Sequence, residues 1–402
     1  MLTSAPPSAG VRLNTNVVNV TSPPIADVHG WIAGMQFPAN RPLFDVAQAV
    51  PVDPPPQALR ETVAELLIRD GLHRYTPIAG LPELRAELAA HMAGAYGAHI
   101  DAPDTLITAG CNQAFCAVVQ ALAGPGDEVV IPVPYYFNHQ MWMDMIGVRT
   151  LHVPFAPAQG GVPTAAAFAD ALTERTRAIA VVTPNNPTGA VYSPELLEDL
   201  YQLARARGIA LIVDETYMDF HPTAQLPAHG LFQHPEWRDT LVQLFSFSKS
   251  YALTGFRVGS VIAGPAIIEQ VTKIQDCLAI CAPRLSQVMA LHAIRTLQPW
   301  VRAQAHAMQT RVTALKDAFA GSASGFELLA AGAWFAYVRH PMTGVAATDV
   351  ARRLAIEQSV LCIPGEVFGP GQEDFIRFAF ANLEAEQMPQ LVERLRLLNS
   401  KN

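Results

Sequence analysis

The stretch IALIVDE, Ile209 to Glu215, places five apolar residues in a row before two carboxylates. An apolar run without polar alternation predicts a strand that is buried on both faces, as in a parallel sheet covered by helices. Four other runs share this character: TLITAG (Thr105 to Gly110), EVVIPV (Glu128 to Val133), RAIAVVTP (Arg177 to Pro184) and LVQLFSFS (Leu241 to Ser248). The sequence therefore predicts a mostly parallel sheet with helices on both of its faces.

Segments of helical character lie between the expected strands. They are NQAFCAVVQALA, Asn112 to Ala123, and SPELLEDLYQLARARG, Ser193 to Gly208. In the second segment Ser193 is suited to cap the helix, Pro194 occupies the first turn, and Gly208 is a typical stop. Strands that alternate with helices predict an α/β core.

The length of the chain predicts more than one domain. The protein has 402 residues, of which 50% are hydrophobic, and single cores stop growing near ~250 to 300 residues. After about residue 265 the sequence changes to long alanine-rich helical stretches, followed by short strands and helices from Phe326 to Leu398. We expect an N-terminal arm at 1–44, a large domain at 45–290 and a smaller α+β domain at 291–402. The arm is expected to pack on the small domain or on a partner subunit.

Composition excludes several classes of function. A net charge of -8 with scattered lysines and arginines provides no basic field for nucleic acid. No apolar segment approaches the ~18 to 20 residues of a membrane span, and the N-terminus lacks an apolar stretch of signal-peptide length. We therefore expect a cytoplasmic protein without nucleic-acid or membrane partners.

The five cysteines contain no CxxC pair, which is typical of reduced thiols in a large intracellular protein. Cys277 and Cys281 are four residues apart and could share a helix face. Two thiols without partner histidines make a poor metal site. We expect no metal, and we expect both cysteines to be buried apolar residues.

The run SFSKSYALTGFRVG, Ser246 to Gly259, surrounds one amine with hydroxyls and an arginine. An aldehyde cofactor such as pyridoxal phosphate needs a neutral amine for a Schiff base, hydroxyl donors for its phosphate and a cation to balance the phosphate charge. Lys249, Ser246, Ser248 and Arg257 could supply these groups. Taken alone, the pattern also fits a solvated surface lysine.

Two upstream runs, VTPNNPTGAVYSPE (Val182 to Glu195) and LIVDETY (Leu211 to Tyr217), add to this pattern. With them the chain resembles fold type I pyridoxal phosphate enzymes of the class I and II aminotransferase family, from about Ser22 to about Asn382. The resemblance implies an aspartate aminotransferase-like fold, pyridoxal 5'-phosphate as cofactor and Lys249 as the catalytic amine. It also implies transamination between an L-amino acid and a 2-oxo acid by a homodimer with shared active sites.

The resemblance also assigns cofactor contacts at strand ends and helix starts. In AGCNQA, Ala109 to Ala114, the amides of Cys111 and Asn112 would cradle the phosphate, although such a run is often only a tight turn. Asp214 would pair with the protonated pyridine nitrogen. A buried carboxylate needs a cation, but an aspartate at this position could instead cap the following helix.

Three further residues would contact the cofactor ring. By resemblance, Tyr217 and Asn186 donate to its phenolic oxygen, which would lower the pKa of the Schiff base. The NNPTG run could also be merely a turn. Tyr136 is assigned to stack on the ring face, with Tyr135 as the competing assignment and core packing as the alternative for either.

The remaining assignments concern the substrate and the partner subunit. Arg377, in DFIRFAFAN, would hold the α-carboxylate bidentately together with Asn186, although a structural salt bridge is the alternative. Tyr75, in RYTPIAGLPELR, would reach the phosphate in the neighbouring subunit. Ala49 occupies a position near the substrate carboxylate where the family usually has glycine, and its methyl group could crowd the substrate.

Other functions remain open at this stage. A lyase acting on cysteine derivatives or a related synthase would use the same lysine, aspartate and arginine. A cofactor-binding regulator would need a DNA-binding domain, for which residues 1–44 lack room and basic charge. Aromatic residues between 136 and 142 hint at an aromatic or bulky apolar substrate, but they also fit a core.

Overall fold

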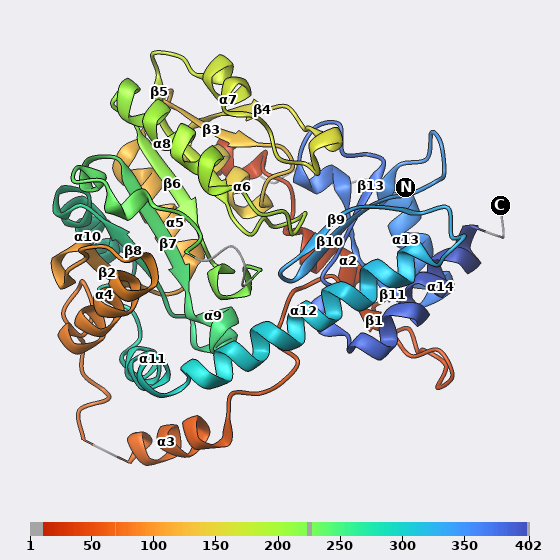
Figure 1. The fold of residues 1–402 in the computed structure, drawn as a ribbon, viewed down its shortest axis with the longest axis horizontal. Helices are drawn as coiled ribbons and strands as arrows, with labels where there is room; N and C mark the ends of the chain where they lie inside the picture. Colours follow the sequence, from red (N-terminus) through yellow and green to blue (C-terminus); the bar gives the residue numbers. More distant parts are fainter. Residues whose placement is uncertain (1–10, 69, 223–226, 400–402) are drawn as a thin grey trace.

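The largest sheet has seven strands in the order β2-β8-β7-β6-β5-β3-β4, and every neighbouring pair is parallel except the two that involve β8. This computed structural model describes residues 11–68, 70–222 and 227–399 (Figure 1). The strands are β2 (Thr105–Thr108), β3 (Glu128–Pro132), β4 (Arg149–Val153), β5 (Thr176–Val182), β6 (Ala210–Asp214), β7 (Leu241–Ser246) and β8 (Gly259–Ala263). All five predicted strands are present.

Both faces of this sheet are buried, as the apolar runs predict. Along β6, Leu211 and Val213 belong to one hydrophobic cluster, whereas Ala210 and Ile212 belong to another. Alternate side chains of a strand point to opposite faces. One face is covered by α4 (Pro82–Tyr96), α8 (Pro194–Arg207) and α11 (Arg284–Thr296), and the other by α5 (Cys111–Leu122), α6 (Phe137–Ile146) and α10 (Pro265–Ala279). The predicted α/β core is confirmed.

The caps predicted for α8 are confirmed in detail. The Ser193 hydroxyl accepts a hydrogen bond from the amide of Leu196 at 3.2 Å, and Pro194 occupies the first turn. Gly208 ends the helix with φ 62°, in the left-handed region. These three residues satisfy or terminate the free backbone groups at the two ends of the helix.

A smaller antiparallel sheet forms the second half of the structure. Its order is β12-β13-β10-β9, with β9 (Glu327–Gly332), β10 (Phe335–Arg339), β12 (Ile363–Pro364) and β13 (Phe375–Phe378). Helices α13 (Ala347–Gln358) and α14 (Met388–Asn399) pack in the same hydrophobic cluster as this sheet. A short parallel pair, β1 (Phe44–Asp45) with β11 (Val360–Leu361), ties the start of the chain to this half.

The helix α12 (Gln298–Ala320) runs along both halves (Figure 1). Val301, near its start, belongs to the cluster of the large sheet, whereas Met308 and Leu315 belong to the cluster of the small sheet. The change of core therefore falls within one continuous helix. The predicted division at residues 290 and 291 remains a prediction.

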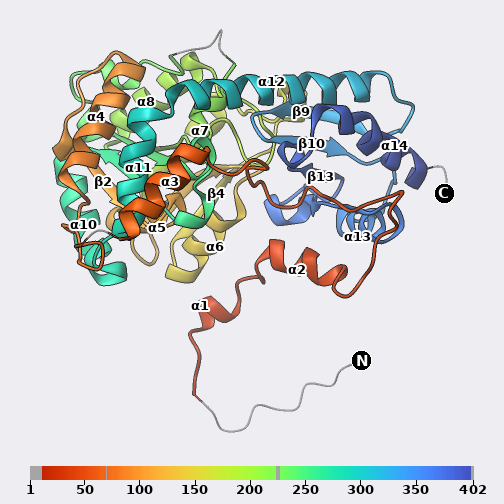
Figure 2. The same ribbon diagram turned by 90° about the horizontal axis from the view of Figure 1, so that it is seen from below.

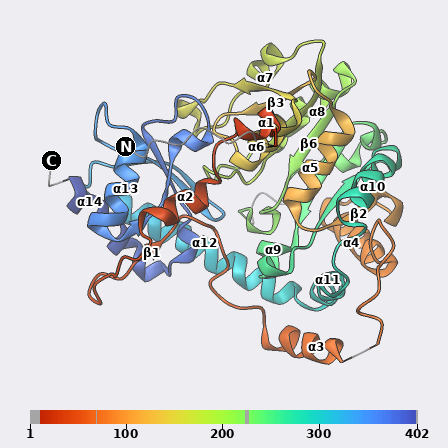
Figure 3. The same cartoon turned by 180° about the vertical axis from the view of Figure 1, so that it is seen from behind.

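The segment before β1 lies across both halves (Figures 2 and 3). Helix α1 (Thr15–Val18) contacts α6, and α2 (Pro24–Trp31) contacts α13 and β12. The first ten residues of the predicted arm lie outside the described residues. The remaining α-helices are α3 (Gln57–Leu67), α7 (Ala165–Ala171) and α9 (Phe247–Ser250).

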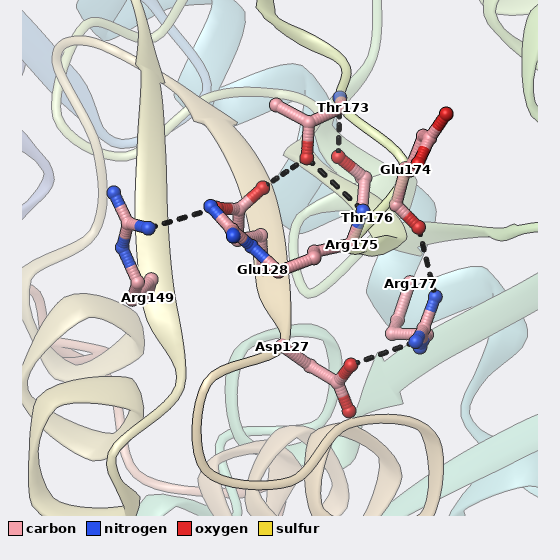
Figure 4. Close-up of polar contacts among 8 residues, drawn as sticks. All are labelled: Asp127, Glu128, Arg149, Thr173, Glu174, Arg175, Thr176 and Arg177. Carbon is pink, nitrogen blue, oxygen red and sulfur yellow. Dashed lines mark hydrogen bonds and ion pairs between the residues drawn. The ribbon is translucent and has the colours of Figure 1, made fainter.

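Ion pairs fasten the amino ends of β3, β4 and β5 (Figure 4). The Glu128 side chain is 1% exposed and pairs with Arg175 at 2.9 Å and Arg149 at 3.2 Å. The Thr173 hydroxyl also donates to it, and this donation is the main reason that the pKa of Glu128 is lowered. These ion pairs join the amino ends of the strands, at the edge of the sheet opposite the carboxyl ends.

The two cysteines near the end of α10 differ in burial. Cys281 is buried, but Cys277 is exposed. The prediction of a buried Cys277 is wrong because α10 turns Ile268, Val271 and Gln275, not Cys277, toward the core.

Within the described ranges, no helix is both long and apolar enough to span a membrane.

The two halves touch backbone to backbone at Gly189 and Gly332. A Cβ on Gly189 would lie 2.4 Å from the nitrogen and 2.4 Å from the oxygen of Gly332, and Gly189 has φ +75°. No side chain fits such a contact. The loop that carries Asn186 is thereby seated directly on the turn between β9 and β10.

We predict that Gly189→Ala destabilises the cofactor-free protein by about 2–5 kcal/mol, through a left-handed alanine and overlap with Gly332. Gly208→Ala is the matched control, because Gly208 has φ +62° with no atom within 4 Å of an added Cβ. The control should lose only about 1–2 kcal/mol. Urea unfolding measures both, and equal losses would show that the contact with Gly332 does not constrain the fold.

Candidate active site

A cavity of about 490 Å³ opens where β5, β6 and β7 end. Its lining includes the last residues of these strands: Val182, Asp214 and Ser246. Open α/β sheets bind ligands at the carboxyl ends of their strands. The volume is also within the ~300–1,000 Å³ typical of ligand pockets.

Twelve of the thirteen residues expected at the site line this one cavity. They are Ala49, Cys111, Asn112, Tyr136, Asn186, Asp214, Tyr217, Ser246, Ser248, Lys249, Arg257 and Arg377. Tyr75 is the exception. Its residue is 73% exposed, and its carbonyl accepts a hydrogen bond from Arg284 at 3.1 Å.

Lys249 lies on the single turn of α9, directly after β7. Its Nζ donates to the carbonyl oxygen of Ala49 at 2.5 Å. Burial, and then the positive charges of Arg257 and Arg377, lower the pKa of Lys249 to about 7. The amine is therefore available in its neutral, nucleophilic form near neutral pH.

The cavity has a cationic end formed by Arg257 and the start of α5. Arg257 has φ 51°, and in the described part of the chain no carboxylate lies within ion-pair distance of it. Its guanidinium packs against Gly110, the N-cap of α5; a Cβ on that glycine would lie 2.3 Å from Nη2. Ser246 Oγ accepts from the Ser248 amide at 3.2 Å, which leaves its own hydrogen to donate. These groups together suit an anion of several oxygens.

Asp214 is the carboxylate of the cavity, and the residue is 5% exposed. Its Oδ1 accepts from the Thr216 amide at 2.9 Å and from Cys111 Sγ at 3.6 Å. Its Oδ2 lies 3.5 Å from His139 Nε2. The bond from Thr216 is a local turn contact, so Asp214 both holds the turn and faces the cavity.

In the sequence, the histidine at position 139 is only one of the aromatic residues that hint at the substrate, and no role beside Asp214 is expected for it. Its imidazole stacks on Phe115 with ring centroids 3.6 Å apart, and its residue is 4% exposed. It thus lies between α5 and the carboxylate of Asp214. The only sequence signal for His139 is its position three residues after Tyr136, in the first turn of α6.

Glu215 points away from the cavity, into a buried polar network. Tyr96 Oη donates to its Oε2 at 2.7 Å, His229 Nε2 lies 3.3 Å from the same oxygen, and the Gln243 amide also donates to it. Burial alone would raise the pKa of Glu215, but His229 and the donors lower it. This anchored carboxylate fixes the end of β6, from which Asp214 and Tyr217 face the cavity.

Arg377, on β13, is 2% exposed and carries no ion pair in the described residues. Its Nη1 donates to Asn186 Oδ1 at 3.0 Å, and its Nη2 donates to the carbonyl of Ala47. The buried Nε atom has no hydrogen-bond partner among the residues that the structure describes. Burial lowers the pKa of Arg377 to about 10. A buried guanidinium without a counter-ion is costly, so this position suits an anionic ligand; the alternative of a structural salt bridge is not observed.

Of the two adjacent tyrosines, Tyr136 lines the cavity and Tyr135 does not. Tyr136 Oη donates to Asn112 Oδ1 at 3.4 Å, whereas Tyr135 stacks on His152 with centroids 5.2 Å apart. Burial raises the pKa of Tyr136 to about 12 and that of Tyr217 well above its usual value. Both phenols therefore remain neutral and able to donate hydrogen bonds.

Comparison with known proteins places this geometry in a family. A sequence profile of the family described as Aminotransferase class I and II matches residues 34–395. An aromatic aminotransferase of Arabidopsis thaliana is 29% identical over 96% of this chain and 95% of its own length. An aspartate aminotransferase of Streptomyces avermitilis is 30% identical over 90% of each chain. The solved structure of aspartate aminotransferase from Thermus thermophilus with maleate superposes with a TM-score of 0.85, at 25% identity, covering 97% of this chain and 100% of the other.

We predict that Lys249 of the cofactor-free protein titrates near pH 7. The sequence contains four lysines, at positions 249, 273, 316 and 401, so their signals can be resolved by NMR after reductive ¹³C-methylation. Exposed lysines titrate near ~10.4, whereas Lys249 should be protonated below about 7 and neutral above it. The α-amine is methylated as well and titrates near ~7.7–8.0, so Lys249→Met should remove one of two low-pH transitions. Four lysine resonances that all titrate above pH 9 would refute the assigned environment.

Proposed function

The chain belongs to the class I and II aminotransferase family, and from this membership we propose that it transfers an amino group between an L-amino acid and a 2-oxo acid, with pyridoxal phosphate bound in the cavity. One observation carries the proposal. A lysine with a pKa near 7 and a buried Arg377, which has no ion pair among the described residues, face the same cavity. The first suits an aldehyde cofactor and the second suits the α-carboxylate of an amino acid.

The residues at the cavity fit the cofactor from end to end. Arg257, the start of α5 and the hydroxyls of Ser246 and Ser248 would hold the phosphate. Gly110 leaves room for the Arg257 guanidinium there, because a Cβ at position 110 would overlap it. Asp214 would keep the pyridine nitrogen protonated. Tyr217 and Asn186 would donate to the ring oxygen, and Tyr136 would lie against the ring face.

His139 would act on Asp214 as a positioning residue. Its Nε2 lies 3.5 Å from the carboxylate, and the stack on Phe115 fixes the imidazole plane. A hydrogen bond from His139 would orient the carboxylate of Asp214, and this orientation decides whether the carboxylate can pair with the pyridine nitrogen. Thr216 and Cys111 constrain the other oxygen, so Asp214 has little freedom to turn away.

Within the reaction, pyridoxal phosphate supplies the electron sink that accepts the electron pair of the Cα–H bond. Arg377 holds the substrate carboxylate and thereby orients that bond. The Lys249 amine, neutral near pH 7, removes the proton from Cα and returns a proton later in the cycle. The buried neutral phenols and the arm residues over the cavity exclude water.

We also propose that the protein works as a homodimer, with Tyr75 of each subunit completing the site of the other. Tyr75 lies outside the cavity of its own chain and is 73% exposed, so it is available to a neighbouring subunit. A cytoplasmic location is proposed as well, since none of the five cysteines forms a disulfide, which suits a reducing compartment.

Lys249→Ala should abolish transamination, by roughly 10⁴-fold or more, because the variant loses both the covalent attachment and the acid–base group. The assay follows formation of a new amino acid from a donor and a 2-oxo acid, with free ammonia measured in parallel. Lys273→Ala, at an exposed lysine of α10, is the control and should keep full activity. Ammonia and pyruvate as the products would instead indicate a lyase.

The shared site can be tested with hybrid dimers. A Tyr75→Ala subunit is paired with a Lys249→Ala subunit and purified through two different affinity tags. If Tyr75 acts across the interface, one site of the hybrid has both residues, and the hybrid should show about half of the wild-type activity at limiting cofactor. Activity no higher than that of the Tyr75→Ala homodimer would place Tyr75 in its own subunit's site.

A further inference from the structure

The cavity is lined by apolar side chains that the proposed chemistry does not use. They come from four separate parts of the chain: Pro23 and Ile25 of the arm, Val50 before α3, Phe137 of α6 and Phe335 of β10. A substrate consists of an α-carboxylate, an amine and a side chain. The first two have Arg377 and the cofactor, so these residues are available to the third.

The apolar residues are close to the proposed carboxylate site. The Phe335 ring centroid lies 5.1 Å from Arg377 Cζ, and so does that of Phe368. Phe137 packs against Phe368 with centroids 5.9 Å apart, and Ile25 belongs to the same hydrophobic cluster. An amino-acid side chain begins one bond from Cα, so a substrate held by Arg377 would extend along this surface.

The arm is held at the cavity from both sides. Helix α1 contacts α6, and α2 contacts α13 and β12 (Figure 3). Pro23, which precedes α2, and Ile25, in the first turn of α2, therefore lie at the cavity between the two halves of the structure. Ile25 is half-buried there, and Pro24, the first residue of α2, is buried.

The charged groups of the cavity are all committed under the proposed function. In the described lining they are Asp214, Lys249, Arg257 and Arg377. Their partners would be the pyridine nitrogen, the cofactor aldehyde, the phosphate and the α-carboxylate. A second carboxylate, or a cationic side chain, would be buried against Ile25 and Phe137 without a partner, which is unfavourable.

We propose that this site takes amino acids with a bulky apolar side chain, aliphatic or aromatic, and that Ile25 and Phe137 form the subsite for that side chain. The inference rests on the proposed transamination. The relatives do not decide the matter, because they include both an aromatic and an aspartate aminotransferase. The discrimination comes from the lining of the cavity.

The test uses the first half-reaction of the holoenzyme, in which one donor at a time converts the cofactor from its aldehyde to its amine form without any acceptor. Absorbance of the cofactor reports the rate. L-Leucine and L-phenylalanine should react with a kcat/KM at least about 100-fold above that of L-aspartate, L-glutamate or L-arginine. Equal or faster reaction of a charged donor overturns this inference while transamination stands; no reaction with any donor overturns the proposed function itself.

Variants of the arm separate direct contact from general packing. Ile25→Ala should lower kcat/KM for L-leucine about 10-fold and leave L-alanine unchanged, because only the larger side chain reaches position 25. Ile32→Ala is the matched control: Ile32 caps the same helix and packs in the same cluster, but lies outside the cavity lining. It should change neither donor.

A charge placed at the same position should reverse the preference. Ile25→Arg is expected to raise the ratio of kcat/KM for L-aspartate over L-leucine by at least about 10-fold, since the new guanidinium gives the second carboxylate a partner. An unchanged ratio, or equal losses in Ile25→Ala and Ile32→Ala, would show that Ile25 holds the arm in place and does not contact the substrate side chain.

Discussion

Three basic side chains face one cavity whose described lining contains a single carboxylate, Asp214. The positive charges of Arg257 and Arg377 lower the pKa of Lys249, after the larger effect of burial. Arg377 is buried with its Cζ atom 5.1 Å from the centroids of the Phe335 and Phe368 rings, and no acid in the part of the chain that the structure describes pairs with it. Such an arrangement costs stability in the free protein, and it is relieved by ligands that bring a phosphate and a carboxylate. The rest of the fold holds these charged side chains around the same cavity.

Neither half of the structure forms this cavity alone. Arg377 lies on β13 of the small sheet, and its guanidinium donates to Asn186, which belongs to the loop after β5 of the large sheet. The same loop touches the turn between β9 and β10 through Gly189 and Gly332. Arg377 lies in the half with the small sheet and Lys249 in the half with the large sheet. A shift of one half against the other would therefore move the carboxylate site relative to Lys249. Helix α12 contributes to both cores.

Two adjacent carboxylates at the end of β6 divide their tasks by direction. Side chains of consecutive strand residues point to opposite faces. Asp214 therefore faces the cavity, where Thr216, Cys111 and His139 surround it. Glu215 faces the core, where Tyr96 and Gln243 donate to it. A buried charge that accepts several hydrogen bonds is rigidly placed, so Glu215 anchors the turn that presents Asp214 and Tyr217.

The sequence by itself determined the layers of the fold and most of the candidate site. Continuous apolar runs predict strands covered on both faces, caps such as Ser193 and Gly208 predict helix ends, and motifs that follow strands predict side chains at one edge of a sheet. These signals are local, and their spacing survives folding. Only the tertiary structure decided which of Tyr135 and Tyr136 faces the cavity, that His139 lies beside Asp214, that Cys277 is exposed, and that Ile25 reaches the site. Each of these depends on how segments far apart in the chain approach one another, and that approach is set by packing across the whole molecule, which no spacing along the sequence records.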